Sequence, residues 1–259
     1  MVLDLLNKEL KQYSKKQLEN TLGLLAEGNT IPFIARYRKE LTGSLDEVQI
    51  KEIADRHQYL ENLENRKEEI IRLISEQDKM TDELQAEIMK ADKLNQLEDL
   101  YRPYRPKRRT KAVIAREKGL EPLAEYILSM PLEGDIDVIA QGYVSDEVPS
   151  IEEALEGAHE IMAEVFGDEP EYRRYIRAHT FRNGVVSTTI AKGELDEKKV
   201  YEMYYDFKEP LTRIANHRVL AMNRAEKEGV IKVEVVIDEA PIYAYLGKSI
   251  IGNRFKSIS

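Results

Sequence analysis

Apolar side chains recur at helical spacing along most of this chain. The longest uninterrupted run covers residues 45–76, where Leu, Ile and Val return at intervals typical of one helix face and neither Gly nor Pro occurs. A stretch of this length is well above the mean helix of about 11–12 residues. The pattern therefore predicts one long helix that acts as a spine for shorter ones.

Polar residues that cap helices mark the starts of several shorter helices. Capping boxes are predicted at three pairs: Ser14 with Gln17, Ser44 with Glu47, and Ser150 with Glu153. Shorter helices are predicted near residues 3–10, 14–27, 32–42, 81–100, 110–119, 122–128, 150–165, 171–181, 194–205 and 215–227. Residues 131–149 are expected to form a loop with little regular structure.

β-Branched residues gather in two short stretches, residues 185–190 and 230–238, and the second is the stronger strand candidate. The predicted fold class is mainly α: a multi-helical scaffold with a long spine helix, a helix-turn-helix-like element and minor β content. We expect a helical domain over residues 1–195, which includes the basic helix-turn-helix-like segment at about 100–130. Residues 196–259 are expected to be a helical linker with a short strand.

The composition of the 259 residues limits the classes of function. There is no Cys, which excludes disulfides, thiolate catalysis and cysteine-ligated zinc. No stretch approaches the ~20 apolar residues of a membrane span, and the first residues lack the basic start of a signal peptide, so a cytoplasmic protein is expected. The net charge of −9 repels nucleic acid on average, so any site for a polyanion must be a local cluster.

One basic segment, residues 102–118, departs from this acidic background, with Glu117 as its one acid. Arginine forks match phosphate oxygens, and interleaved Tyr101 and Tyr104 could stack on bases. The predicted nucleic-acid-binding residues are Arg102, Arg105, Lys107, Arg108, Arg109, Lys111, Arg116 and Lys118. Three interpretations stay open: contact with nucleic acid or phosphate, ion pairing with acidic residues of this same chain, and docking on a protein partner.

A weaker signal overlaps the basic segment. Ala115, the Gly119-Leu120 pair and a helix start at Pro122 have the spacing of a helix-turn-helix corner, where a small residue and a glycine turn let two helices approach. A second, smaller basic patch occurs at Arg36, Arg38 and Lys39. Two interpretations stay open for it: an ordinary surface face, or part of one groove together with the basic segment.

Motifs of self-contained active sites do not occur in the sequence. Phosphate-binding loops, dinucleotide-binding turns, zinc-protease motifs and serine-hydrolase elbows are absent, and His57, His159, His179 and His217 are far apart. We therefore predict no catalytic residue, no metal ligand, no cofactor and no small-molecule substrate, and expect a protein that is not an enzyme. The alternative is a metal-dependent nuclease using Asp238 and Glu239, since acids at strand ends are common in nucleases.

Three long stretches resemble the Tex family of bacterial transcription accessory proteins: GNTIPFIARYRKELTGSLDE (28–47), LEDLYRPYRPKRRTKAVIAREKGLEPLA (97–124) and YYDFKEPLTRIANHRVLAMNRAEKEGVI (204–231). Their order matches the N-terminal region of that family, whose members are much longer. The resemblance implies further domains beyond this region: a resolvase-like nuclease fold, helix-hairpin-helix elements and an OB-type RNA-binding domain. Similarity to the core of a eukaryotic transcription elongation factor is also implied.

The resemblance implies a transcription-linked role for a longer protein, of which this chain looks like an N-terminal part. In the family, nucleic-acid binding is attributed largely to the C-terminal domains, and residues 102–118 are the contribution expected from this region. We expect a non-catalytic scaffold that helps the full-length protein to associate with RNA or DNA. The alternative is a scaffold that docks on RNA polymerase or another transcription or translation partner. RNA or DNA preference and oligomeric state stay open.

Overall fold

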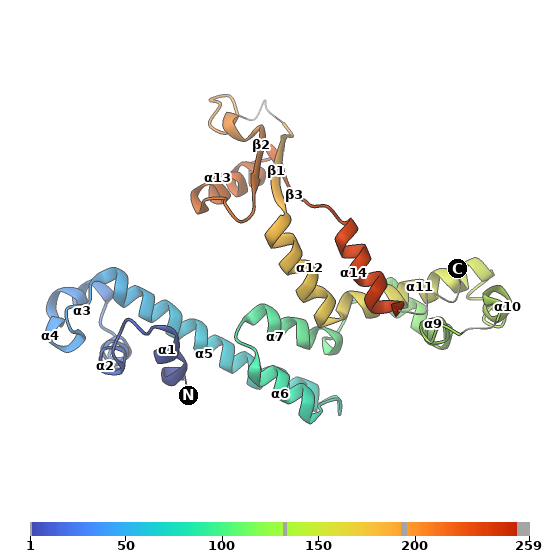
Figure 1. Cartoon of the computed structure of the whole chain (residues 1–259), viewed down its shortest axis with the longest axis horizontal. Coiled ribbons are helices and arrows are strands. Elements are labelled where there is room, and N and C mark those ends of the chain that lie inside the picture. The colour runs from blue at the N-terminus through green and yellow to red at the C-terminus, as the bar shows by residue number, and fades with distance from the viewer. Residues whose placement is uncertain (1, 132–133, 193–195, 253–259) are drawn as a thin grey trace. The chain divides into compact units, whose positions relative to one another are not determined.

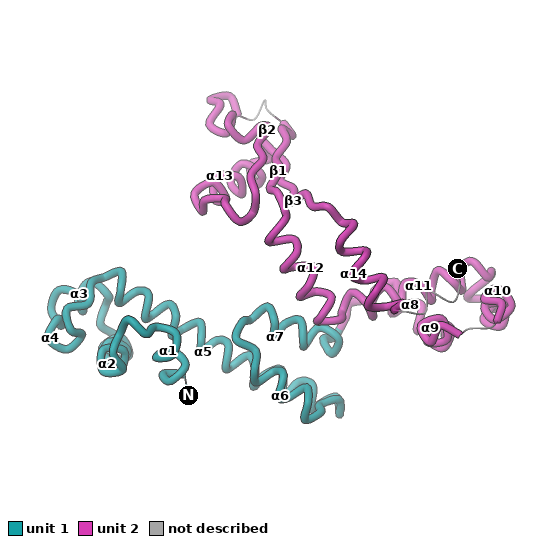
Figure 2. Tube along the Cα trace, viewed as in Figure 1, with its two compact units in different colours: residues 1–106 teal, residues 107–259 magenta. Residues whose placement is uncertain are grey.

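The computed structural model describes residues 2–131, 134–192 and 196–252, and the chain divides into two compact units, residues 1–106 and 107–259 (Figures 1 and 2). The fold is mainly α with one small sheet, which confirms the predicted class. None of the helices in the described part of the chain combines the length and apolar character needed to span a bilayer.

Helices make up the first unit, and the longest of them is α5. Its elements are α1 (Val2–Glu9), α2 (Lys15–Ala26), α3 (Ile31–Tyr37), α4 (Lys39–Thr42), α5 (Glu47–Ser75), α6 (Asp82–Lys90), α7 (Leu94–Tyr101) and the 3₁₀ turn η1 (Arg102–Tyr104).

Helix α5, with 29 residues, confirms the prediction of a spine. Its first half buries Ile50, Ile53 and Leu60 against α1, α2 and α3. Its second half buries Leu63 and Ile70 in a second cluster with α6 and α7. Because α5 contributes side chains to both clusters, the packing of the first unit requires α5 to be one continuous helix.

Helix α5 begins two residues later than its predicted capping box. The capping box is formed by Asp46 and Gln49, and not by Ser44 and Glu47. Ser44 has a φ of 64°, in the left-handed region, because it continues the turn that ends α4. An N-cap residue needs extended backbone, which Asp46 has with φ −86° and ψ 176°. The predicted box at Ser14 and Gln17 is confirmed.

The second unit combines helices with a sheet. Its elements are α8 (Lys111–Glu117), α9 (Glu121–Leu128), α10 (Ile136–Gln141), α11 (Ile151–Asp168), α12 (Pro170–Asn183), β1 (Val185–Ile190), η3 (Glu202–Tyr204), β2 (Asp206–Pro210), α13 (Asn216–Lys227), β3 (Ile231–Val236) and α14 (Ala240–Ile250).

Helices α8, α9 and α10 pack against α11, and their contact is built largely from alanines and leucines. The Ser150 side chain accepts a hydrogen bond from the Glu153 amide, so the predicted helix start at residue 150 is confirmed. The expectation of a loop with little regular structure over residues 131–149 was wrong for its middle part, which contains α10. Helix α10 forms there because Asp135 caps it by accepting from the Asp137 amide, and because it buries Ala140.

The sheet has the order β2-β1-β3, and both pairings are antiparallel. The strands predicted at 185–190 and 230–238 are confirmed as β1 and β3. The helix predicted over 194–205 was wrong: in its described part, residues 196–205, the helical content is the short turn η3, and residues 194 and 195 lie outside the described residues. The expected domain boundary at residue 195 falls within the second unit, between β1 and the strands with which it pairs.

Candidate nucleic-acid interface

The predicted basic segment belongs partly to each unit, since the first unit ends at Pro106 and the second begins at Lys107. In the first unit, Tyr101 ends α7 and is only 4% exposed within the core. The Arg66 guanidinium carbon lies 5.3 Å from the centroid of the Tyr101 ring. In this conformation Tyr101 is a core residue whose ring has no open face for a base.

Tyr104 and Arg105 follow in the first unit. The Tyr104 ring is half-buried against the same core cluster, and its backbone carbonyl accepts a hydrogen bond from Gln77 Nε2 at 3.0 Å. The side chains of Arg102 and Arg105 are exposed. In the part of the chain that the structure describes, the Arg105 side chain makes no hydrogen bond and no ion pair.

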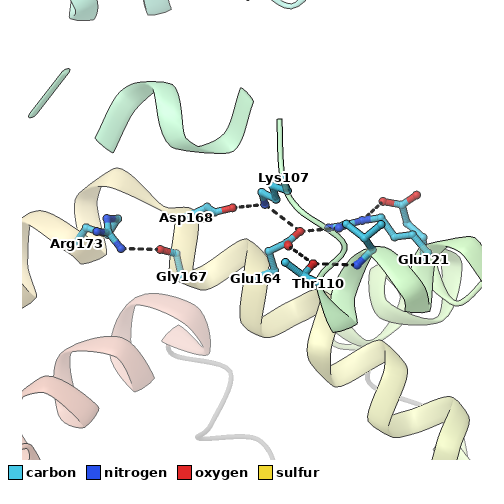
Figure 3. Close-up of polar contacts among 9 residues, drawn as sticks. Lys107, Thr110, Glu121, Glu164, Gly167, Asp168 and Arg173 are labelled. Atoms are coloured by element: carbon cyan, nitrogen blue, oxygen red, sulfur yellow. Dashed lines mark hydrogen bonds and ion pairs between the residues drawn. The ribbon is translucent and has the colours of Figure 1, made fainter. Parts of the chain in front are cut away.

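In the second unit, two of the predicted cations meet one carboxylate of α11, Glu164 (Figure 3). Lys107 Nζ lies 2.9 Å from Glu164 Oε1 and also pairs with Asp168, and Arg116 Nη1 lies 2.5 Å from Glu164 Oε1. Thr110 Oγ1 donates to the other Glu164 oxygen at 3.2 Å. The Glu164 side chain is 13% exposed, so this group of contacts, the Glu164 cluster, holds the start and end of α8 against α11.

The protonation of Glu164 follows from these contacts. Burial by itself would raise the pKa of the Glu164 carboxyl. The hydrogen bonds and charges of Lys107 and Arg116 outweigh that effect and hold the pKa below its usual value. Glu164 is therefore a carboxylate at neutral pH, and the two cations satisfy a charge of this same chain.

The remaining cations of the second unit are differently placed. Lys111 pairs with Glu160 at 2.9 Å and Arg109 with Glu117 at 3.3 Å, but the two cationic side chains are 72% and 74% exposed. Exposed pairs of this kind contribute about 0–1 kcal/mol and exchange readily. Arg108 and Lys118 are exposed and make no ion pair with any residue that the structure describes. The six predicted cations of the second unit thus separate into two groups. Lys107 and Arg116 are held by carboxylates of this chain, and the other four are exposed to a partner.

A tight corner joins α8 to α9. The Thr110 side chain caps α8 by accepting from the Val113 amide, and Gly119, with φ +78°, makes the turn into α9. On the other side of α8, a Cβ added to Gly157 of α11 would lie 3.4 Å from the Ala115 Cβ and 2.3 Å from Leu120 Cδ1. The small residues at 115 and 157 therefore allow α8 to lie close against α11.

Two features concern residues outside the basic segment. Asp238 and Glu239 begin α14: Asp238 Oδ1 accepts from the Ala240 amide at 3.1 Å, and Glu239 accepts from the Tyr243 hydroxyl at 2.8 Å. In the described ranges, no group of three or more His, Asp or Glu side chains is placed to hold a metal ion. A further arginine-rich stretch, residues 173–182, was not among the predicted sites, although the absence of any acid among its arginines is visible in the sequence.

Two family models match the chain: the Tex-like protein N-terminal domain over residues 1–75, and the Tex central region-like over residues 133–257. The chain belongs to the Tex family. The basic segment lies between the two matched regions of this Tex-family chain.

Named relatives agree with this assignment. The uncharacterised protein YdcI of Bacillus subtilis is 53% identical over 248 residues, covering 95% of this chain and 34% of the relative. The transcriptional accessory protein Tex of Neisseria gonorrhoeae is 41% identical over 243 residues, covering 93% and 32%. S1 RNA-binding domain-containing protein 1 of Homo sapiens is 28% identical over 232 residues, covering 85% and 23%. This Tex-family chain spans about a third of the length of the two bacterial relatives.

Proposed function

We propose that this chain acts as the N-terminal, non-catalytic scaffold of a Tex-like transcription accessory protein and contributes to its association with RNA or DNA in the cytoplasm. Membership of the Tex family and the name of the Neisseria relative, a transcriptional accessory protein, support the transcription context. The name of the human relative, which contains an S1 RNA-binding domain, supports nucleic acid as the partner of the longer protein.

The observation that carries the proposal for this chain is the exposure of Arg108, Arg109, Lys111 and Lys118 around α8. Arg109 and Lys111 can leave their exposed carboxylates for phosphates at little cost. Meanwhile Lys107 and Arg116 keep α8 fixed to α11 through Glu164. Phosphate contacts of this type position a protein on nucleic acid and do not read its sequence.

The α8–α9 pair is proposed as the helix-turn-helix-like element. Its role here would be to present cations from a rigid corner, since α8 is only seven residues long and its apolar side faces α11. The exposed cations lie at the start of α8 and in the turn that follows it. A phosphate backbone passing along the corner would meet both groups.

The test measures fluorescence anisotropy of labelled single-stranded RNA and DNA with the 259-residue chain at several salt concentrations. The double variant Arg108→Ala/Arg109→Ala removes two proposed contacts. The slope of log affinity against log salt should become shallower by about 1.4, at about 0.7 per contact with a single strand. The matched control is Lys15→Ala/Lys16→Ala, an exposed pair of neighbouring cations in α2, which should leave the slope unchanged.

Equal effects of the two double variants would show that binding follows net charge and not this corner of the fold. No binding by the unaltered chain at tens of micromolar would also contradict the proposal. Recognition would then reside in other parts of the longer protein, and this chain would serve as a protein scaffold.

A further inference from the structure

Helix α12 concentrates positive charge more strongly than any part of the second unit after α8. It carries Arg173, Arg174, Arg177 and Arg182, and no acid lies between Tyr172 and Asn183. None of its residues is fully buried, although the helix spans 14 residues. A helix of this length without a buried side chain has a large surface that its own neighbours leave open.

One side of α12 is occupied by aromatic contacts with α14. The rings of Tyr175 and Tyr245 stack with centroids 3.7 Å apart and planes 11° apart, and Tyr172 meets Tyr245 edge-on at 6.2 Å. His179 stacks on Tyr175 at 6.0 Å. At about 100° per residue, Tyr172, Tyr175 and His179 fall within about 60° of the helix circumference. This side is therefore committed to packing within the chain.

The opposite side of α12 is basic. By the same helical geometry, Arg174, Arg177 and Phe181 fall within a second arc of about 60°, centred roughly opposite the aromatic side, and Arg173 lies about 40° beyond it. Phe181 is 62% exposed between the arginines. An exposed phenylalanine is costly in water, and here it lies among side chains whose forked donors match phosphate oxygens.

A small pocket adjoins this basic side. Its lining combines aromatic rings with guanidinium groups.

 The pocket beside α12 has a volume of 260 Å³ and is lined by Phe166, Gly167, Tyr172, Arg173, Ile176 and Arg177. Typical small-molecule clefts have volumes of about 300–1,000 Å³, so this pocket is smaller than most of them. A pocket of this size fits one flat group better than a whole ligand. Arg173 Nη1 donates to the Gly167 carbonyl at 3.3 Å, which fixes the guanidinium at the pocket wall (Figure 3).

We propose that the basic side of α12, formed by Arg173, Arg174, Arg177 and Phe181 with the adjoining pocket, binds single-stranded nucleic acid. The arginines contact successive phosphates, and Phe181 stacks on an unpaired base. A duplex offers the same phosphates but keeps its bases stacked on one another, so the exposed ring favours a single strand. The site goes beyond the proposed function, because it uses no residue of the basic segment.

The experiment measures anisotropy of labelled single-stranded RNA, single-stranded DNA and blunt duplex DNA with the full chain. Phe181→Ala should weaken single-strand binding by about 5- to 150-fold, the range for loss of one base-stacking ring, and leave duplex binding unchanged. Phe181→Leu keeps an apolar side chain without an aromatic face and should show most of the same loss. Comparing RNA with DNA then shows whether the 2′-hydroxyl contributes.

The matched control for charge is Arg182→Gln, an exposed arginine of the same helix that lies off the basic side. Arg174→Gln should make the salt slope for single strands shallower by about 0.7, and Arg182→Gln should not. Equal effects of these two variants, an unchanged single-strand affinity in Phe181→Ala, or an equal loss for duplex would each overturn the proposal. Arg108→Ala/Arg109→Ala is measured in parallel, so that failure at α12 and failure at α8 are seen separately.

Discussion

Glu164→Gln tests whether the Glu164 cluster holds α8 on α11. The change keeps the size of the side chain and leaves an oxygen for Thr110, but it removes the charge that Lys107 and Arg116 share. Two hydrogen bonds to a charged group, at about 1.5–3 kcal/mol each, set an upper limit of about 3–6 kcal/mol. Lys107 keeps Asp168 and Arg116 keeps Glu121, so we expect a loss of about 2–3 kcal/mol in the free energy of unfolding.

The loss should depend on pH in a defined direction. Because the folded state lowers the pKa of Glu164, the carboxylate contributes stability above its ordinary value of 4.5, and this contribution disappears as pH falls through the folded pKa. The difference between the unaltered chain and Glu164→Gln should be full at pH 7 and shrink below about pH 4.5.

The assay is urea unfolding followed by circular dichroism at pH 7, 5 and 4, with amide hydrogen exchange of α8 as a local measure. Faster exchange in α8, with α5 in the first unit unchanged, is the expected pattern. Equal stability at pH 7, or a difference that grows as the pH falls, would refute the assignment of Glu164 as the residue that fixes α8.

Three further predictions concern stability. Lys67 Nζ lies 2.8 Å from Glu64 Oε1, and both side chains are buried. Lys67→Met should therefore lower the free energy of unfolding, measured with urea, by about 3–5 kcal/mol, and the double variant with Glu64→Leu should recover most of that loss. Gly119→Ala forces a Cβ into a backbone with φ +78° and should cost about 1–2 kcal/mol, seen as a lower melting temperature. Thr21 is fully buried, and its hydroxyl has no partner in the described part of the chain, so Thr21→Val should be at least as stable in thermal unfolding.

The helical elements could be predicted because their apolar spacing is local information. The run at 45–76 became α5 almost residue for residue, and Ser14 caps its helix as expected. Strand β2 was missed because its sequence, DFKEP, has no apolar run. It forms because its backbone pairs with the edge of β1, whose residues lie about twenty positions earlier in the chain. Information of that kind is not visible in a local window.

The candidate site shows the same limit. The sequence identified the charge of residues 102–118, but it could not show that Glu164 and Asp168, far along the chain, would take up Lys107. It also could not show that Tyr101 ends a helix with its ring in the core. The basic side of α12 could have been predicted from the sequence, because residues spaced as Arg174, Arg177 and Phe181 are share one face of a helix.

The central place of β1 in the sheet has a consequence for how the protein is made. β1 ends at Ile190, whereas the two strands that cover its edges end at Pro210 and Val236. At the ribosome's pace of about 5–20 residues per second, the newly made strand waits roughly 2–9 s for its last neighbour. During that interval a β-branched strand with open edges is exposed to other nascent chains. The speed of translation between residues 190 and 236 should therefore influence how much of the protein reaches its folded state.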